Sequence, residues 1–187
     1  MTTQAIRATN DFVIKFANVN GSGSASANEM FARAIIRMGV PVSPRNIFPS
    51  NIQGMPTWYE VRVSERGWLG RRGGCDLMVA LNAQTWDADV AEIEPGGYLF
   101  YDSTKHVPAE RLRPDITVIG IPLTAICARE FTDPTQRKLF KNIMYVGALA
   151  ALLDVELAVV EALIAQQYRG KDKLIDGNRR AAQIGYD

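Results

Sequence analysis

Glycines and small polar side chains gather in one short segment of this chain, Asn18-Val19-Asn20-Gly21-Ser22-Gly23-Ser24. The segment separates an apolar run at 12–17 from an amphipathic run at 25–38 that Gly39 closes. A strand, a glycine turn and a helix in this order place free backbone N–H groups at the positive end of a helix, where an anion or a cofactor edge can bind. Asn18, Asn20 and Ser24 add hydrogen-bonding side chains beyond the needs of a bare turn. We therefore expect binding here; the alternative is a turn whose glycines serve only the backbone path.

The glycine spacing does not match a complete dinucleotide fingerprint. Gly21 and Gly23 fit the first two glycines of G-x-G-x-x-G, but Ser26 occupies the third position. The fingerprint also needs an acidic residue about 20 residues further on, and residues 40–45 contain none. No Gly-Lys-Ser/Thr follows, so a P-loop is excluded. One alternative is a free-standing nucleotide-binding oxidoreductase in which Arg45 reads a 2′-phosphate, although the flanking prolines would distort the strand end that must hold it.

A second polar segment, residues 50–58, leads into a predicted strand. Its candidate binding residues are Ser50, Asn51, Gln53 and Gly54. A restricted loop at the rim of a sheet can present amide groups to a ligand or a partner. An ordered connection that is capped by its own amides explains the pattern equally well.

A third group consists of arginines set among glycines: Arg62, Arg66, Arg71 and Arg72. Guanidinium groups can clamp phosphates or the carboxylates of a partner. The alternative is a solvated hairpin loop whose arginines pair with Glu60 and Glu65.

Conventional catalytic and metal-binding patterns are missing from the sequence. The one histidine, His106, lies in a polar loop and predicts a surface position. Neither G-x-S-x-G nor H-E-x-x-H occurs, so we predict no catalytic and no metal-binding residue. Cys75 and Cys127 lie far apart in apolar runs, which predicts buried thiols in a reducing compartment. Without C-x-x-C the chain cannot alone hold an iron–sulfur cluster. Such a domain is expected to be part of a larger enzyme.

The composition is that of a water-soluble α/β protein. The chain has 187 residues, 47% of them hydrophobic, and a net charge of +1; this size allows one domain with a substantial core, and this charge gives no case for a nucleic acid or membrane partner. The N-terminus lacks a signal-peptide stretch, and the longest apolar run, 143–153, falls short of the about 20 residues that span a bilayer. We expect a cytoplasmic protein.

Strand and helix patterns alternate along the chain. Strands are predicted at 12–17, 58–64, 76–82, 98–101 and 116–119. Helices are predicted at 25–38, 85–91, 124–129, 136–153, 154–168 and 171–184. This alternation predicts an α/β fold with a Rossmann-like, doubly wound, mostly parallel sheet and C-terminal helices.

The remaining segments carry weaker signals. Prolines exclude a helix at 41–56, Pro95-Gly96-Gly97 predicts a turn, and residues 1–10 are expected to fray. No boundary signal appears, so we predict a single domain over 1–187. The helices at 136–168 are apolar on more than one face, which predicts burial in the domain or in a subunit contact, and self-association of the lone chain.

Taken together, these segments resemble the gamma domain of the 2-oxoacid:ferredoxin oxidoreductases, in the form fused to the alpha subunit of 2-oxoglutarate-type enzymes. The resemblance covers about residues 11–187. It rests on the segments 15–26, 49–54, 59–64, 76–80, 95–97 and 142–149. One departure is that Ser24-Ala25-Ser26 replaces the Gly-Gln-Gly of many gamma domains.

The resemblance implies an enzyme that decarboxylates a 2-oxoacid such as 2-oxoglutarate, passes electrons to ferredoxin and transfers the acyl group to coenzyme A. Thiamine diphosphate, magnesium and an iron–sulfur cluster belong to partner domains, so the isolated chain should be inactive. The implied partners are thiamine-binding alpha and beta subunits, with ferredoxin contacted indirectly. Fused relatives continue beyond position 187, so the chain is either a small subunit or a segment of a longer polypeptide.

By analogy with the family, this domain shapes the approach of coenzyme A and the subunit interface. The implied surface consists of Asn18, Asn20, Gly21, Gly23, Ser24, Ser50, Asn51, Gln53, Gly54 and Arg62. A module that serves only assembly, whose loop binds protein and not cofactor, is the remaining alternative.

Overall fold

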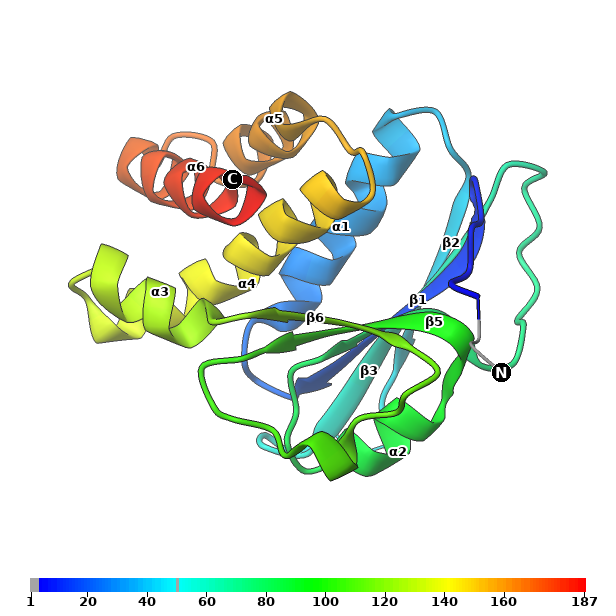
Figure 1. Cartoon of the computed structure of the whole chain (residues 1–187). Coiled ribbons are helices and arrows are strands. Elements are labelled where there is room, and N and C mark those ends of the chain that lie inside the picture. The colour runs from blue at the N-terminus through cyan, green and yellow to red at the C-terminus, as the bar shows by residue number, and fades with distance from the viewer. Residues whose placement is uncertain (1–3, 50) are drawn as a thin grey trace. The chain divides into compact units, whose positions relative to one another are not determined.

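The computed structural model describes residues 4–49 and 51–187, which form two compact units (Figure 1). The sheet unit contains the described residues up to Gly21 together with Val40–Pro122. The helical unit contains Ser22–Gly39 and Leu123–Asp187. The sequence carries no signal for this division. The chain passes between the units three times: after Gly21 inside the first strand–turn–helix segment, after Gly39 and after Pro122.

The sheet unit is built on one mixed sheet in the order β2-β3-β1-β4-β5-β6. Its strands are β1 (Asp11–Val19), β2 (Val42–Ile47), β3 (Pro56–Ser64), β4 (Cys75–Ala80), β5 (Ile93–Asp102) and β6 (Thr117–Ile121). The pairs β1–β4, β4–β5 and β5–β6 are parallel, whereas β1–β3 and β2–β3 are antiparallel. Four of the six strands therefore run parallel to one another, which confirms the predicted α/β class.

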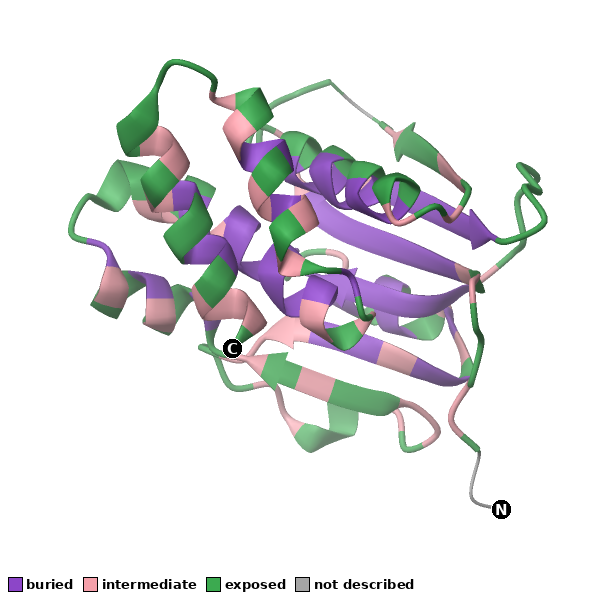
Figure 2. Ribbon diagram, turned by 90° about the horizontal axis from the view of Figure 1, so that it is seen from above, coloured by how far each residue is buried: buried purple, intermediate pink, exposed green. Residues whose placement is uncertain are grey.

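Burial follows the position of each strand in the sheet. Every residue of β4 is buried, as its continuous apolar run predicts. The edge strands β2 and β6 carry many exposed residues, which Figure 2 shows as green and pink strands beside purple ones. One face of the sheet packs on helix α2 (Trp86–Ala91), where Trp86 meets Tyr101 edge to face at a centroid distance of 5.5 Å.

Strand β2 lies inside the proline-rich stretch, where we predicted no regular element. Pro44 lacks a backbone N–H group, so proline is tolerated in an edge strand whose outer side needs no ladder bond. Helix was correctly excluded there, but the strand was missed.

The predicted turn at Pro95-Gly96-Gly97 is wrong, because these residues lie inside β5. The β4–β5 register shifts between Cys75 and Leu77, so the glycines accommodate a bulge. Gly96 accepts a hydrogen bond from the Ile6 N–H at 2.7 Å, and the Tyr98 hydroxyl donates to Ile6 O at 3.0 Å. The chain before β1 is therefore held at Ile6 against β5, and fraying does not extend through all of residues 1–10.

The helical unit contains α1 (Ser24–Arg37), α3 (Leu123–Glu130), α4 (Pro134–Leu152), α5 (Leu157–Gln167) and α6 (Asp172–Tyr186). Each lies within a few residues of its predicted range. Helix α4 begins where Asp133 accepts from the Thr135 N–H at 2.8 Å, with Pro134 in the first turn. Its residues from Asn142 to Ala150 are all buried. None of the helices in the described part of the chain is long and apolar enough to cross a membrane.

Candidate functional site

Two loops of the sheet unit interlock at the carboxyl end of β1. The Asn20 N–H donates to Met55 O at 2.8 Å, and the Gly54 N–H donates to Asn20 O at 3.0 Å. The Asn20 side chain also donates, from Nδ2 to Ile52 O at 3.1 Å. Asn20 therefore holds residues 51–55 beside the end of β1, although the two loops are more than 30 residues apart in sequence.

Gly21 and Gly54 are required by the geometry of this loop pair. Both have positive φ, +82° and +88°, a conformation that other residues adopt only at a cost. A Cβ on Gly21 would lie 2.8 Å from Cγ of Gln53. The structure therefore brings together Asn20, Gly21, Gln53 and Gly54, and leaves the neighbouring Asn51 side chain exposed.

Asn18 lies two residues before Asn20, inside β1, and beside the segment that follows β4. It is 4% exposed, and its carbonyl accepts from Nδ2 of Asn82 at 3.2 Å. Asn82 follows the buried strand β4 and its Oδ1 accepts from the Gln84 N–H at 3.0 Å. Sequence reasoning missed Asn82, although a polar residue directly after a buried parallel strand is a signal for the ligand-binding edge of a sheet.

The first turn of α1, in the helical unit, has the features of an anion site. Gly23 has φ +78°, and no side chain of the described residues caps the helix. Its first turn contains no acidic residue, and Ala25 and Ser26 are exposed. The positive end of the helix dipole is therefore not compensated locally.

Side chains of α4 fix this helix start in place. Asn142 donates from Nδ2 to Ser22 O at 2.9 Å, and the Ser22 hydroxyl donates to Oγ of the buried Ser24 at 3.0 Å. One turn further along, the Tyr145 hydroxyl donates to Oδ1 of Asn28 at 2.7 Å. Burial alone raises the pKa of Tyr145 far above its ordinary value, so its hydroxyl stays a neutral donor.

Arg62 does not belong to the same surface. It pairs in register with Val13, near the start of β1, about 20 Å from Asn20 along an extended strand. Its guanidinium contacts Asp11 and donates to Val63 O at 2.6 Å. The side chain is 8% exposed, so we assign Arg62 a structural role at the opposite end of the strand.

A buried polar network underlies helix α2, and sequence reasoning missed it. Lys15 Nζ contacts Glu92 Oε2 at 2.6 Å, and Asp89 accepts from Trp58 Nε1 at 2.8 Å and from Thr85 Oγ1 at 2.5 Å. Burial raises the pKa of Asp89, while the bonds from Thr85 and Trp58 oppose that shift. These contacts hold β1, β3 and α2 together.

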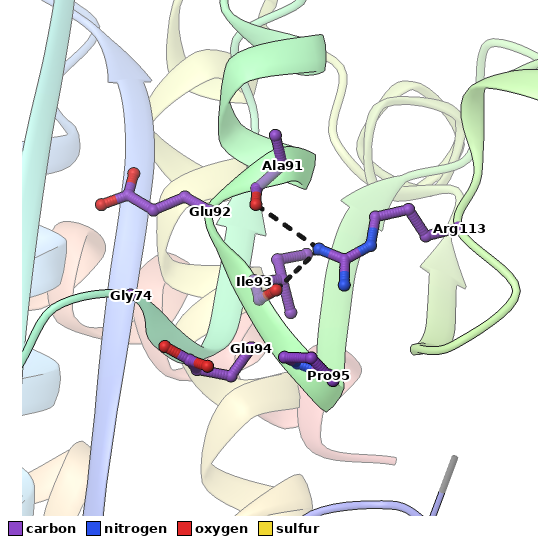
Figure 3. A pocket seen from close by; sticks show the side chains of 7 residues that line it. All are labelled: Gly74, Ala91, Glu92, Ile93, Glu94, Pro95 and Arg113. Atoms are coloured by element: carbon purple, nitrogen blue, oxygen red, sulfur yellow. Dashed lines mark hydrogen bonds between the residues drawn. The ribbon is translucent and has the colours of Figure 1, made fainter.

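A shallow depression of about 640 Å³ lies at the amino ends of β4 and β5 (Figure 3). Glu92 and Glu94 line it beside Gly74. The Arg113 guanidinium points to backbone carbonyls there and donates to Ile93 O at 2.6 Å. None of the predicted binding residues that the structure describes lines this depression.

Of the other predicted positions, Ser50 lies outside the described residues. His106 is exposed and both cysteines are buried free thiols, as predicted. Burial raises the pKa of Cys75 to about 12. Among the described residues, no three His, Cys, Asp or Glu side chains gather as a metal site.

The strand that pairs with β1 on the side away from β4 also bears on the nucleotide-binding alternative. A dinucleotide fold places a parallel strand there, whose carboxyl end holds the ribose reader. Here that neighbour is β3, which is antiparallel and begins at Pro56 opposite Val19. Arg45 lies one strand further out on β2, opposite Glu60. This arrangement does not present Arg45 as a ribose reader at the glycine turn.

Residues 13–187 match the family described as "Pyruvate ferredoxin/flavodoxin oxidoreductase". The chain belongs to this family. The resemblance drawn from the sequence segments is thereby confirmed.

Two curated relatives illustrate the range of the family. The chain is 26% identical over 176 residues to 2-oxoglutarate synthase subunit KorC of Archaeoglobus fulgidus, covering 93% of this chain and 86% of that one. It is 22% identical over 214 residues to 2-oxoacid:ferredoxin oxidoreductase 2, subunit alpha, of Aeropyrum pernix, covering 95% of this chain. The chain spans only 33% of that longer relative.

Solved structures show the same fold. Pyruvate oxidoreductase subunit PORC of Thermotoga maritima superposes with a TM-score of 0.78 at 21% identity, covering 95% of this chain and 96% of that one. A 2-oxoglutarate:ferredoxin oxidoreductase of Magnetococcus marinus, solved with 2-oxoglutarate, coenzyme A and succinyl-CoA bound, gives a TM-score of 0.82 at 24% identity. That match covers 95% of this chain and 31% of that one.

Proposed function

We propose that this chain is the gamma part of a 2-oxoacid:ferredoxin oxidoreductase and supports coenzyme A-dependent oxidative decarboxylation of a 2-oxoacid such as 2-oxoglutarate. The family match over residues 13–187 carries this proposal. The KorC relative, which this chain covers to 86% of its length, supports the 2-oxoglutarate class. Thiamine diphosphate, magnesium and the iron–sulfur cluster are assigned to thiamine-binding alpha and beta partners, and ferredoxin is reached through them.

Within that enzyme, the chain is proposed to hold coenzyme A by its anionic groups. The first turn of α1 offers backbone N–H groups, a positive dipole end and no acidic residue. Phosphates bind such helix starts well. In the sheet unit, the Asn20–Gln53 loop pair presents amide groups at the carboxyl end of β1 and is a second, separate candidate surface for the same ligand. The chain's role is to bind and orient, and the redox chemistry belongs to its partners.

The test is Ser26→Asp in the assembled enzyme, with Ser26→Asn as a neutral control of matched shape. Ser26 is exposed in the first turn of α1, where an acidic side chain stabilises a helix. Weaker binding therefore cannot be attributed to unfolding. We expect Ser26→Asp to raise the KM for coenzyme A at least about fivefold, which is the effect of two charges about 4 Å apart in water.

The same variant should leave the KM for the 2-oxoacid unchanged, and Ser26→Asn should behave as wild type. An unchanged KM for coenzyme A in Ser26→Asp would remove the helix start from the binding site. It would leave the loop pair to be tested by Asn20→Ala with the same two measurements.

A further inference from the structure

An exposed aromatic loop lies between β3 and β4, at the end of the sheet opposite Asn20. We call residues 65–74 the Trp68 loop; its sequence is Glu-Arg-Gly-Trp-Leu-Gly-Arg-Arg-Gly-Gly. At its tip Trp68 is 55% exposed and Leu69 is 72% exposed. Large apolar side chains that are exposed next to one another on a loop indicate an interaction surface.

The residues around this apolar tip carry a net positive charge. The loop contains three arginines and one glutamate, a net charge of +2. The Arg66 guanidinium lies 5.4 Å from the centre of the Trp68 ring. Tryptophan and arginine side chains are the two that most often dominate binding at protein interfaces. The tip therefore fits an apolar pocket with acidic side chains at its rim.

The base of the loop is anchored, so the tip is held in position before any partner binds. Arg71 contacts Glu60 at 3.4 Å, and Arg72 contacts Asp76. Both acids are less than 10% exposed, and Asp76 also accepts the Val13 N–H at 2.7 Å. A pre-positioned loop loses less conformational entropy when it docks.

The ion pairs also narrow the choice of partner. Arg71 and Arg72 already face carboxylates, so the loop does not offer the cluster of uncommitted guanidinium groups that a nucleic acid or an anionic membrane would attract. A symmetric contact with a second copy would bring two loops of net charge +2 together. A different polypeptide with an acidic surface has neither drawback.

We propose that the Trp68 loop docks into an acidic-rimmed apolar pocket on the thiamine-binding polypeptide of the same enzyme. This inference rests on the proposed function for the existence of that polypeptide. It adds a contact that is separate from the Asn20–Gln53 loop pair, since the Trp68 loop lies at the other end of β1. Trp68 and Leu69 fill the pocket, and Arg66 faces its acidic rim.

The test measures the affinity of the full 187-residue chain for the purified thiamine-binding polypeptide by calorimetry at low and high salt. We expect the double variant Trp68→Ala/Leu69→Ala to weaken binding at least tenfold. Arg66→Glu should weaken it mainly at low salt, because salt screens exposed charges. The control Ile36→Ala removes an apolar side chain from the last turn of α1 that is 49% exposed, and it should bind as wild type.

These residues are exposed, so each variant should retain the thermal unfolding midpoint of the wild type. Binding of the double variant within twofold of wild type would overturn the inference. A change in self-association without a change in affinity for the partner would overturn it as well, and would identify a second copy as the occupant.

Failure of the proposed function looks different. If the wild-type chain neither binds the thiamine-binding polypeptide nor supports coenzyme A-dependent turnover with it, the proposed function and this inference both fail. If the wild type binds and supports turnover while the tip variants bind equally well, only the Trp68 loop contact is refuted.

Discussion

Replacing Gly21 by alanine tests the interlocked loops most sharply, because the same loop pair contains its own control. Both Gly21 and Gly54 have positive φ. An L-residue in this conformation costs about 1–2 kcal/mol. A Cβ on Gly21 would also lie 2.8 Å from Cγ of Gln53, whereas none of the described residues would lie within 4 Å of a Cβ on Gly54.

Gly21→Ala therefore carries two costs and Gly54→Ala carries one. The Gln53 side chain must leave its rotamer to make room, which costs about 1 kcal/mol. We expect Gly21→Ala to lower the free energy of unfolding by roughly 2–3 kcal/mol and Gly54→Ala by roughly 1–2 kcal/mol. Urea unfolding of the full chain measures both.

Removing the Gln53 side chain should remove the extra destabilisation of Gly21→Ala. In the double variant Gly21→Ala/Gln53→Ala the second cost disappears, so a double-mutant cycle should return a coupling of about 1 kcal/mol between positions 21 and 53. Equal destabilisation by Gly21→Ala and Gly54→Ala, or a coupling of zero, would refute the interlocked geometry.

Three further perturbations test the interior of the two units. Lys15→Met leaves Glu92 without its partner and should cost about 2 kcal/mol, less than a fully buried pair because that carboxylate is 35% exposed; recovery in Lys15→Met/Glu92→Leu, measured by urea unfolding, checks the cause. Asp89 has a raised pKa, so its folded form binds a proton more tightly than the unfolded chain. The free energy of unfolding of wild type, relative to that of Asp89→Asn, should therefore be greatest below pH 3.8, the ordinary pKa, and should fall as the pH rises through the folded pKa. A difference between the two proteins that does not change with pH would contradict this. In the helical unit a Cβ on Gly147 would lie 2.0 Å from Ala182 O, so Gly147→Ala should cost about 1–3 kcal/mol and lower the thermal midpoint, and an unchanged midpoint would rule out the close α4–α6 contact.

Much of the fold could be predicted because its strongest patterns report burial directly. The continuous apolar run of β4 predicts a strand covered on both faces, and all six of its residues are buried. The long apolar run predicts a helix at 136–153, which corresponds to α4 (Pro134–Leu152), and the start was missed by two residues because the cap at Asp133 was not recognised. These elements need no information about distant parts of the chain.

The errors occur where tertiary context outweighs local preference. Pro95-Gly96-Gly97 predicts a turn, but pairing with β4 draws it into β5 as a bulge. Strand β2 contains Pro44 and few apolar residues, and it forms because β3 offers it an open edge. In both cases the residues themselves give no information about the strand that pairs with them.

The candidate site follows the same rule: its local features could be predicted, and its tertiary pairing could not. Asn20 and Gly21 were named because turn chemistry is local, and residues 51–54 were named as a polar rim segment; their binding role stays a prediction. Their interlocking depends on the antiparallel register of β3 beside β1, which the sequence does not reveal. That register also carries Arg62 to the opposite end of the strand, and it explains why grouping Arg62 with Asn20 failed.

The central claim is that this chain binds and orients while its partners carry the redox chemistry. The most direct measurement is 2-oxoacid-dependent, coenzyme A-dependent reduction of an electron acceptor by the chain alone, by the thiamine-binding polypeptides alone, and by the two combined. We predict no turnover by the chain alone and full turnover only by the combination. Turnover by the chain alone, or a combination no faster than the thiamine-binding polypeptides by themselves, would contradict the claim.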